Sequence, residues 1–374
     1  MSNPKVSIVK CISYDQLLVQ DAVRKTVDLL GGISAYVKPG SRVLVKPNLL
    51  MAKEPEFGIT THPEVVRAVI RILKENDCLV FVGDSPSVWG RYIENVGQVY
   101  ERTGMRRVCE EEKVELVNFD KRRMRTKFPL TTWLDSCDYL VNIPKFKTHE
   151  LTLMTGAIKN LFGLVTGTYK TELHKNYYDM EEFADIVVDI YQEARPALTI
   201  VDAITAMEGD GPATGGKLRQ LNLLLGSSDC VALDSILAFI MGIRPYDVLT
   251  TKEAAHRGLG MPDTRHMDIC GERLEDVAGD PFLLPTSAIT RKVMPAWLIG
   301  LARRLIKYYP YPVRANCIRC SACIEACPNN AITMVGKGIA IDYKKCIACF
   351  CCQETCPALA IKVKKSFLAK MIGL

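Results

Sequence analysis

The chain has 374 residues, of which 48% are hydrophobic and 24% are charged. These fractions are typical of globular proteins and exclude a disordered, collagen-like or coiled-coil chain. The length is sufficient for two or three compact units with their own cores. No apolar run approaches the roughly 20 residues that a membrane-spanning helix needs, and residues 1–10 lack the apolar region of a signal peptide. We therefore expect a cytoplasmic protein without a transmembrane segment, whose mature chain begins at Met1.

The net charge of +6 is confined to one end of the chain. From Arg314 to Leu374 there are nine Lys and Arg residues against three Asp and Glu residues, a surplus equal to the whole net charge. The preceding part is formally neutral. This balance argues against a body that binds polyanions, and it leaves room for a local basic pocket.

From Lys5 to about Leu284, short β-branched runs alternate with segments of helical period. This alternation predicts an α/β domain with a mainly parallel sheet. The predicted strands are Val6–Val9, Arg42–Lys46, Leu79–Val82, Val114–Phe119, Tyr139–Ile143, Leu198–Val201 and Leu221–Leu225. The clearest predicted helices are Gln16–Leu30, Glu64–Lys74, Met180–Ala194 and Cys230–Met241.

The alternation ends near residues 277–285, and an apolar stripe with basic residues follows from Arg291 to Tyr311. We predict an amphipathic linker helix that ends at the prolines 310 and 312. Packing between two domains is the commoner role of such a stripe, and lying on a membrane surface is the alternative. The chain then divides into an α/β domain (1–285), the linker (286–313) and a C-terminal domain with a basic tail (314–374).

Nine of the 15 cysteines lie between Cys317 and Cys356, in the only internal repeat of the sequence. Each half of the repeat reads C-x2-C-x2-C-x3-C-P. Three thiolates at this spacing can hold one face of a [4Fe–4S] cluster, while the fourth reaches the other cluster. We therefore predict two [4Fe–4S] clusters. The ligands of the first are Cys317, Cys320, Cys323 and Cys356, and those of the second are Cys327, Cys346, Cys349 and Cys352.

Other roles for this cysteine array agree less well with the sequence. A zinc site is normally complete with two cysteine pairs and needs neither a third cysteine nor the Cys-Pro ends. A reducing compartment disfavours disulfides. Cys351 is surplus to the repeat, and the six cysteines outside it lie among apolar neighbours, so all seven are expected to be structural thiols.

Residues from about Arg314 to Val363 resemble a bacterial-type two-cluster ferredoxin domain. The resemblance implies a small α+β fold that transfers single electrons at low potential. It does not identify the molecule that is reduced.

Polar and basic residues gather where four strands of the N-terminal domain are predicted to end. The segments are Lys46-Pro-Asn48, Gly83-Asp-Ser-Pro86, Asn142-Ile-Pro-Lys145-Phe-Lys147-Thr-His149, and the glycine-rich stretch 202–216. The carboxyl ends of parallel strands lie side by side, so these segments can form one crevice. Its lysines would attract a carboxylate or phosphate group, and Asn48 and Asn142 would orient it. In the alternative, each segment merely ends a strand or forms a surface turn.

Several strings in this part of the chain look like those of the domain-of-unknown-function 362 family. They are Val43-Leu-Val-Lys-Pro-Asn48, Thr61-His-Pro63, Gly83-Asp-Ser85, Asn142-Ile-Pro-Lys-Phe-Lys-Thr-His149, Gly156-Ala-Ile-Lys-Asn-Leu-Phe-Gly163 and Glu208-Gly-Asp-Gly-Pro212. The similarity spans most of residues 5–270, and members are often followed by a two-cluster ferredoxin domain. The family name carries no secure reaction, so the resemblance supports the domain boundary and the candidate residues.

The string Gly156–Gly163 predicts a short helix that presents Lys159 and Asn160 to the same crevice, where its N-terminus could bind an anion. Together with Lys46, Asn48 and Asn142, these residues are the predicted ligand-binding or cofactor-binding set. The sequence has neither a GxGxxG motif nor a Walker motif, so it predicts no Rossmann or P-loop nucleotide site. A flavin stays open as a cofactor without a motif that supports it.

Of the five histidines, His149 is the best candidate for proton transfer. We expect Lys145 and Lys147 to depress its pKa, which would keep the imidazole neutral and available. A reduction needs protons as well as electrons, and a histidine or lysine in a partly closed cleft can supply them. His149, Lys145 and Lys147 are therefore the predicted catalytic residues.

Two functions of different classes follow from this organisation. In the first, the chain is an iron–sulfur oxidoreductase that passes low-potential electrons to a small anionic substrate or bound cofactor in the N-terminal domain. In the second, it is a non-catalytic redox partner or maturation factor that docks on a larger enzyme and reduces it. The basic tail could steer an acidic partner protein. It lacks the aromatic residues of a single-strand nucleic-acid platform, and a solvated tail is its simplest interpretation. The sequence leaves the oligomeric state open.

Overall fold

The computed structural model describes residues 3–86, 96–125, 127–167, 169–170, 173, 180–213, 215–285, 308–358 and 360–365. Most of the predicted linker helix (286–307) and the end of the basic tail (366–374) lie outside these residues. Among the described residues, no helix is both long enough and apolar enough to cross a membrane.

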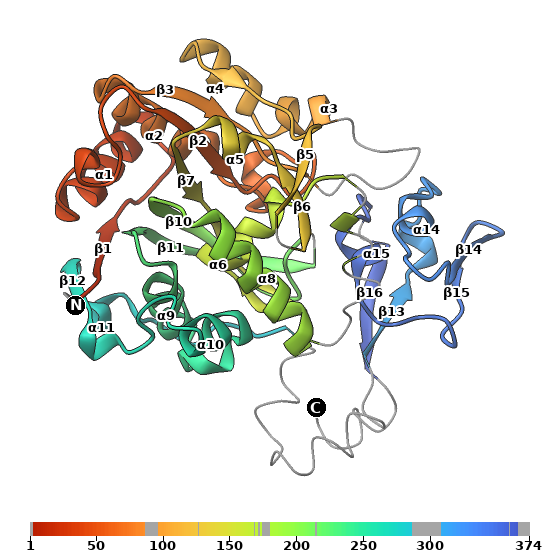
Figure 1. Cartoon of the computed structure of the whole chain (residues 1–374). Helices are drawn as coiled ribbons and strands as arrows, with labels where there is room; N and C mark the ends of the chain where they lie inside the picture. Colours follow the sequence, from red (N-terminus) through yellow and green to blue (C-terminus); the bar gives the residue numbers. More distant parts are fainter. Residues whose placement is uncertain are drawn as a thin grey trace.

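A ten-stranded mixed sheet forms the centre of the N-terminal domain (Figure 1). Its main path has the order β12-β1-β11-β10-β7-β2-β3-β4, and β8 and β9 branch from β10. The strands from β10 to β4 along this path are parallel, whereas β11 is antiparallel to both β10 and β1. The strands are β1 (Lys5–Lys10), β2 (Arg42–Pro47), β3 (Leu79–Val82), β4 (Glu115–Leu116), β7 (Tyr139–Ile143), β8 (Lys145–His149), β9 (Leu153–Thr155), β10 (Leu198–Gly209), β11 (Gly216–Ser227) and β12 (Asp268–Gly271). The predicted α/β fold with a mainly parallel sheet is confirmed.

Helices cover both faces of this sheet and create two hydrophobic cores. In β2, Val43 and Val45 join one core while Leu44 joins the other, because neighbouring strand residues point to opposite faces. Burial on both faces explains why the parallel strands are apolar at successive positions. The first core includes helices α1 (Gln16–Leu29), α2 (Pro63–Glu75), α3 (Val96–Arg102) and α4 (Met105–Glu111), and the second includes α6 (Ala157–Asn160), α8 (Met180–Ala194), α9 (Cys230–Ile240) and α10 (Leu249–His256).

Shorter elements complete the N-terminal domain. A hairpin of β5 (Arg122–Arg125) and β6 (Phe128–Thr131) forms a separate two-stranded sheet. Its strand β6 connects to the segment after α6 through a bridge between Leu130 and Val165. The remaining short helices are α5 (Trp133–Ser136) and α11 (Leu274–Val277).

Two segments that the sequence predicts as polar strand ends are themselves strands. The stretch 202–216 continues β10 as far as Gly209, and β11 begins at Gly216, so the two form a long hairpin. Residues 145–149 form β8, which pairs with β10 in parallel. Backbone pairing stabilises these polar residues in extended form, which hydrophobic alternation alone does not reveal.

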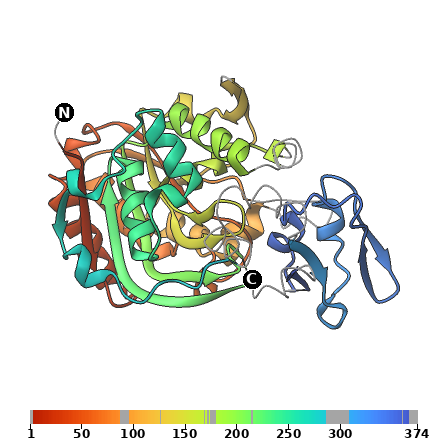
Figure 2. The same ribbon diagram turned by 90° about the horizontal axis from the view of Figure 1, so that it is seen from below.

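The C-terminal module is a small α+β unit, as predicted. Strand β13 (Tyr308–Pro312) pairs with β16 (Ile361–Lys365), and β14 (Ile332–Val335) pairs with β15 (Gly338–Ile341). Two one-turn helices, α14 (Ala322–Glu325) and α15 (Cys351–Glu354), carry cysteines of the repeat. Residues 308–312, which the sequence assigns to the end of the linker helix, are thus a strand, because extended backbone suits their two prolines. Figures 1 and 2 place this module beside the long β10–β11 hairpin.

Candidate functional site

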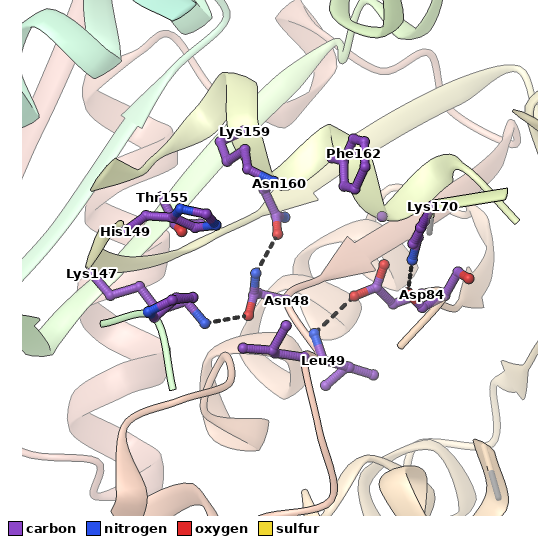
Figure 3. Close-up of a pocket in the computed structure, with 14 residues that line it drawn as sticks. Asn48, Leu49, Asp84, Lys147, His149, Thr155, Lys159, Asn160, Phe162 and Lys170 are labelled. Atoms are coloured by element: carbon purple, nitrogen blue, oxygen red, sulfur yellow. Dashed lines mark hydrogen bonds between the residues drawn. The ribbon is translucent and has the colours of Figure 1, made fainter. Parts of the chain in front are cut away.

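A pocket of about 590 Å³, open to solvent, lies where β2 and β3 end, between β8 and the segment that begins with α6 (Figure 3). This is the crevice position expected at the carboxyl ends of parallel strands. The lining residues are Asn48, Leu49, Leu50, Asp84, Ser85, Lys147, His149, Thr155, Lys159, Asn160, Phe162, Gly163, Lys170 and Pro212. Three lysines and one carboxylate are among them, so the lining is predominantly basic.

A chain of hydrogen bonds between side-chain amides forms one wall of the pocket. Lys147 Nζ donates to Asn48 Oδ1 over 3.0 Å, and Asn48 Nδ2 donates to Asn160 Oδ1 over 2.8 Å (Figure 3). Asn160 Nδ2 donates to Asn142 Oδ1 over 2.8 Å, and Asn142 Nδ2 donates to the carbonyl of Ala157 over 2.9 Å. Both ends have fixed polarity, because an ammonium only donates and a carbonyl only accepts. The orientation of all three amides is therefore determined.

This polarity decides which chemistry the amides present. Each amide oxygen accepts a hydrogen bond from the preceding member of the chain, while each NH₂ group uses one of its two hydrogens in it. At Asn48 and Asn160, which line the pocket, the remaining hydrogens suit a ligand that accepts hydrogen bonds. Carboxylate and phosphate groups have this property.

A buried ion pair forms the base of the pocket. Lys46 Nζ lies 2.7 Å from Asp84 Oδ1, and Asp84 Oδ2 accepts a hydrogen bond from the backbone N–H of Leu49 over 2.8 Å. Lys46 itself is fully buried and does not line the pocket. A Cβ atom on Gly163 would lie 2.3 Å from Asp84 Oδ1, so only glycine allows this close approach.

Lys170 lines the pocket beside this ion pair and donates a hydrogen bond to the carbonyl of Ser85. The pKa of Lys170 is lowered to about 7, mainly by burial, with smaller contributions from the positive charges of Lys46 and Lys159 and an opposing effect of Asp84. An amine with this pKa is close to half protonated at neutral pH. It can give up or take a proton in the pocket.

His149 ends strand β8 and is 4% exposed at the pocket (Figure 3). Its Nδ1 accepts backbone N–H groups from Leu151 at 3.1 Å and from Thr152 at 3.5 Å. The neutral imidazole then carries its proton on Nε2. The structure brings His149 together with Lys147, Lys159, Asn48 and Asn160 around one cavity.

Lys145 lies apart from this pocket in a separate buried cluster. Its Nζ lies 2.9 Å from Asp202 Oδ2 and 2.6 Å from the Tyr14 hydroxyl, which donates to Asp202 Oδ1 over 2.8 Å. Asp202 also accepts the backbone N–H of His62 over 2.9 Å, and the His62 ring stacks on Tyr14 at 3.8 Å. Lys145 is 1% exposed and is not among the pocket residues. We call Tyr14, Lys145 and Asp202 the clasp.

The predicted anion site at the N-terminus of the Gly156–Gly163 helix is wrong. The carboxylate of Asp234 accepts the backbone N–H groups of Ala157 at 2.6 Å and of Ile158 at 3.1 Å. A Cβ atom on Gly156 would lie 2.1 Å from the same carboxylate. The carboxylate of Asp234 thus occupies the N-terminus of α6. Asp234 lies 77 residues after Ala157 in the sequence, so the local pattern did not reveal this contact.

The cysteine repeat folds into two loops with the same backbone geometry. In the first loop Arg319 and Ser321 have positive φ angles, and in the second Ala348 and Phe350 occupy the equivalent positions with positive φ angles. Non-glycine residues rarely adopt this conformation, and its recurrence is typical of a functional site. It curls each loop so that the three cysteines face one side.

Four of the residues that line a small cavity in the module are cysteines, and they are the predicted first set: Cys317, Cys320, Cys323 and Cys356. The pKa of Cys323 is raised to about 12, first by burial and then by the three other thiols of the set. The bare thiols therefore hold their protons, whereas iron would displace them and form thiolates. Among the described residues, no three His, Cys, Asp or Glu side chains converge on a position for a single metal ion.

The second predicted set is likewise gathered. The pKa of Cys352 is raised well above its usual value, by burial and then by the neighbouring thiols Cys349, Cys346, Cys323 and Cys327. The fourth cysteine of each half also accepts a matching backbone hydrogen bond, from Ala331 N to Cys327 Sγ at 3.1 Å and from Ala360 N to Cys356 Sγ at 3.2 Å. The donor set, the cavity and these N–H···S bonds fit [4Fe–4S] clusters, which supply one-electron transfer when bound.

Two segments connect the pocket with the cluster-binding loops. Leu50 lines the pocket, and three residues later Lys53 Nζ donates to the carbonyl of Pro357 over 3.3 Å. Pro212 also lines the pocket, and a Cβ atom on nearby Gly215 would lie 3.1 Å from Gln353 Nε2. Pro357 follows Cys356 and Gln353 follows Cys352. Both contacts therefore reach residues adjacent to predicted cluster ligands.

The predicted site residues do not include Asp84, Lys170, Tyr14 or Asp202, although the predicted crevice segments 83–86 and 202–216 contain Asp84 and Asp202. A signal existed for Asp84, because it follows β3, and Lys46 is the penultimate residue of the paired strand β2. Asp202 was recognisable as an acid near a strand end, but its pairing with Lys145 depends on the β8–β10 register. No pattern in the sequence pointed to Lys170 or Tyr14.

The chain is similar to a curated protein and to solved structures. The chain is 34% identical over 266 residues to the Thylakoid-associated protein sll1697 of Synechocystis sp., which covers 69% of this chain and 80% of that protein. Among solved structures, the lactate racemase apoprotein from Thermoanaerobacterium thermosaccharolyticum matches with 12% identity and a TM-score of 0.42. That match covers 65% of this chain and only 58% of the racemase chain, and it carries no argument about function.

Family models match both parts of the chain. The model described as a domain of unknown function, DUF362, matches residues 43–239, and a 4Fe-4S dicluster domain matches residues 316–360. The C-terminal match assigns the module to iron–sulfur electron transfer. The chain belongs to the DUF362 family, with a 4Fe-4S dicluster domain at its C-terminal end.

Proposed function

We propose that this protein is an oxidoreductase that passes low-potential electrons from two [4Fe–4S] clusters to a small anionic substrate or bound cofactor in the N-terminal pocket. One observation carries the proposal. The segments that contribute Leu50 and Pro212 to the pocket also contact the residues next to Cys356 and Cys352. The route from the clusters to the pocket is therefore short and runs through packed protein.

The chemistry of the pocket supports an anionic ligand. Lysines outnumber carboxylates in its lining, and the amide chain turns N–H groups of Asn48 and Asn160 toward acceptors. Lys147, Lys159 and Lys170 supply positive charge in a partly enclosed cavity, where electrostatic attraction is stronger than in water. A carboxylate or phosphate group is the ligand chemistry that this arrangement favours.

The proposed reaction is a two-electron reduction with two protons. Each cluster passes one electron, so the pair supplies both electrons, and an external low-potential donor protein must reduce the clusters again. Lys170 and His149 line the pocket and carry protons at Nζ and Nε2. We propose that the Lys170 ammonium gives one proton to the ligand, that the second proton comes from solvent through the open pocket, and that the Nε2–H of His149 donates a hydrogen bond to the ligand.

We propose the cluster ligands residue by residue: Cys317, Cys320, Cys323 and Cys356 for the first cluster, and Cys327, Cys346, Cys349 and Cys352 for the second. The cavity between the four thiols of the first set and the matching N–H···S bonds support this division. We also propose that the domains divide at residues 285 and 313. We propose a cytoplasmic location for the protein. The cyanobacterial relative is named for its association with thylakoids, so cell fractionation is the direct test of location.

The test begins with the full chain purified under anaerobic conditions. Iron analysis should give about eight irons per chain, from two four-iron clusters, and mass analysis of the released small molecules should find an anionic ligand. Reduced protein should then transfer two electrons to that ligand or to a compound of its class, with the clusters returning to the oxidised spectrum. A bound flavin would identify the acceptor as a cofactor.

A matched variant separates the enzyme from the alternative of a non-catalytic redox partner. Lys147→Met should abolish ligand retention and turnover while the cluster spectrum stays unchanged. If the wild-type protein retains no ligand and reduces no small anion, yet reduces a partner protein, the carrier function is correct and the proposed oxidoreductase is wrong.

A further inference from the structure

Residues 48–59 connect the two functional parts of the protein, and we call this segment the strap. At its two ends it is bonded to the pocket, because Lys147 Nζ donates both to Asn48 Oδ1 at 3.0 Å and to the carbonyl of Ile59 at 2.5 Å. In its middle it reaches the C-terminal module through Lys53. The strap is therefore one of the two segments by which the N-terminal domain contacts the module.

The strap is held in place by a small hydrophobic cluster. Met51 and Ile59 from the strap pack with Met207 and Ala213 from the β10–β11 hairpin, and all four side chains are buried. A turn with a hydrogen bond from Lys53 N to the carbonyl of Met51 over 2.9 Å fixes the backbone next to this cluster. The packing of Met51 and Ile59, which lie on either side of Lys53 in the sequence, thus fixes the position of Lys53.

The Lys53 ammonium lies at the edge of the first predicted cluster site. Its Nζ is 3.3 Å from the carbonyl oxygen of Pro357, the residue after Cys356, and 5.3 Å from the centroid of the Phe57 ring. Cys356 is one of the four cysteines around the cavity, and its thiol is buried. The side chain of Lys53 is half-buried, so water screens its charge only in part.

The contact near the second predicted cluster site has a different character. There Gln353, which follows Cys352, covers Gly215 with its amide, and this side chain is buried and uncharged. The N-terminal domain thus presents a positive charge near Cys356 and a neutral amide near Cys352. The two clusters experience different electrostatic surroundings from the same docked domain.

We infer that Lys53 raises the reduction potential of the cluster held by Cys356, and that the N-terminal domain in this way sets which cluster accepts electrons more readily. Reduction adds a negative charge to a cluster, and a nearby ammonium stabilises that charge. Removing the ammonium should therefore make this cluster harder to reduce. Lys53 is not a catalytic residue, because it touches no substrate and acts only through the potential of the cluster.

The test is a redox titration of the full-length holoprotein, followed by optical absorbance and by electron paramagnetic resonance. Lys53→Met should shift one of the two midpoint potentials to a more negative value and leave the other in place. Lys53→Glu should shift the same midpoint further in the same direction, since it reverses the charge. Lys53→Arg should keep the wild-type value, because the guanidinium retains the charge.

Lys38→Met is the matched control. Lys38 is exposed and precedes β2, whereas the strap follows β2, so the two lysines lie beyond opposite ends of this strand. This variant loses the same charge and should leave both midpoints unchanged. An equal shift in Lys38→Met and Lys53→Met would show a general effect of net charge and would overturn the inference, as would unchanged midpoints in both Lys53→Met and Lys53→Glu.

These measurements need no pocket ligand, so their outcome is independent of the proposed oxidoreductase activity. Cluster content should stay at the wild-type level in all four variants, because neither Lys53 nor Lys38 is fully buried. If Lys53→Met fails to assemble, the comparison of Lys53→Arg with Lys53→Glu still decides the question. Equal midpoints in that pair would also contradict a role for the charge.

Discussion

Lys145 and Lys147 stand two residues apart on β8, yet the protein uses their charges in opposite ways. Lys145 faces the carboxylate of Asp202 and the hydroxyl of Tyr14 in the buried clasp. Lys147 donates hydrogen bonds to the amide oxygen of Asn48 and to the carbonyl of Ile59, and it lines the pocket. The charge of Lys145 is used to neutralise a buried carboxylate. The charge of Lys147 contributes to the positive potential of the pocket, where an anion can use it.

The difference arises from the register between β8 and β10. In this parallel pair, Lys145 is opposite Asp202, whereas Lys147 is opposite Met207, because a bulge shifts the register between the two positions. Without the shift, Lys147 would lie opposite a residue two positions after Asp202. Lys147 and His149 line the pocket, and register irregularities of this kind often reorient side chains at functional sites.

The largest expected effect is on folding, from Lys145→Met. The substitution leaves the buried carboxylate of Asp202 without its ammonium partner, and breaking a buried pair in this way costs about 3–5 kcal/mol of unfolding free energy. Chemical denaturation of the holoprotein, followed by circular dichroism, measures this loss.

The double variant Lys145→Met/Asp202→Leu is the control for that prediction. It removes both charges and should recover most of the lost stability, because no uncompensated charge remains in the interior. Both variants should keep the cluster spectrum at temperatures where they are folded. A Lys145→Met protein of wild-type stability with lost anion binding would reverse the assignment and place Lys145 in the site.

The next effect is on binding, from Lys147→Met. Removing this ammonium takes a charge from the pocket and removes the donor that orients the amide chain through Asn48. We expect affinity for inorganic sulfate to fall ten- to a hundredfold, or about 1.4–2.7 kcal/mol. Isothermal titration calorimetry with sulfate measures it.

The stability of Lys147→Met should fall by about 1–3 kcal/mol, the typical effect of leaving buried acceptors unsatisfied. This loss is smaller than that of Lys145→Met, because Lys145→Met leaves the buried carboxylate of Asp202 without its ammonium partner. If the two variants lose equal stability and both keep the wild-type sulfate affinity, the assignment of Lys147 to the pocket and of Lys145 to the clasp is wrong.

The fold was largely predictable from local pattern. The bounds of β3, β7 and α8 agree with the sequence prediction at both ends, because an unbroken apolar or amphipathic period defines them. The polar extensions of β10 and β11 were not predictable in this way. Their pairing depends on each other and on β8, which are long-range partners.

The sequence predicted where the site lies, but it predicted only some of the residues that line it. The strand-end rule indicated the crevice and selected Asn48, Lys147 and His149, because it needs only the order of parallel strands. The rule could not separate Lys145 from Lys147, since the bulge that divides them leaves no mark in the sequence. It also could not show that Asp234 occupies the N-terminus of α6, because their contact joins segments far apart in the chain.

The smallest expected effect is a pH dependence of anion binding that belongs to the pocket and not to the clasp. The pKa of Lys170 is lowered to about 7, and Asp84, Lys46 and Lys159 are the charged groups around it. Below pH 7 its ammonium adds a positive charge to the pocket, and above pH 7 the neutral amine does not. Sulfate affinity should therefore fall about tenfold between pH 6 and pH 8, in proportion to the protonated fraction of Lys170.

Calorimetry with sulfate at several pH values tests this sign, since sulfate keeps its charge over that range. His149 lines the same pocket, so a control must separate the two groups. Lys170→Arg retains its charge at all these pH values and should bind sulfate with little change from pH 6 to pH 8. If Lys170→Arg shows the wild-type pH dependence, another group such as His149 carries the titration. If affinity rises with pH in the wild-type protein, the positive charge of Lys170 does not contribute to binding.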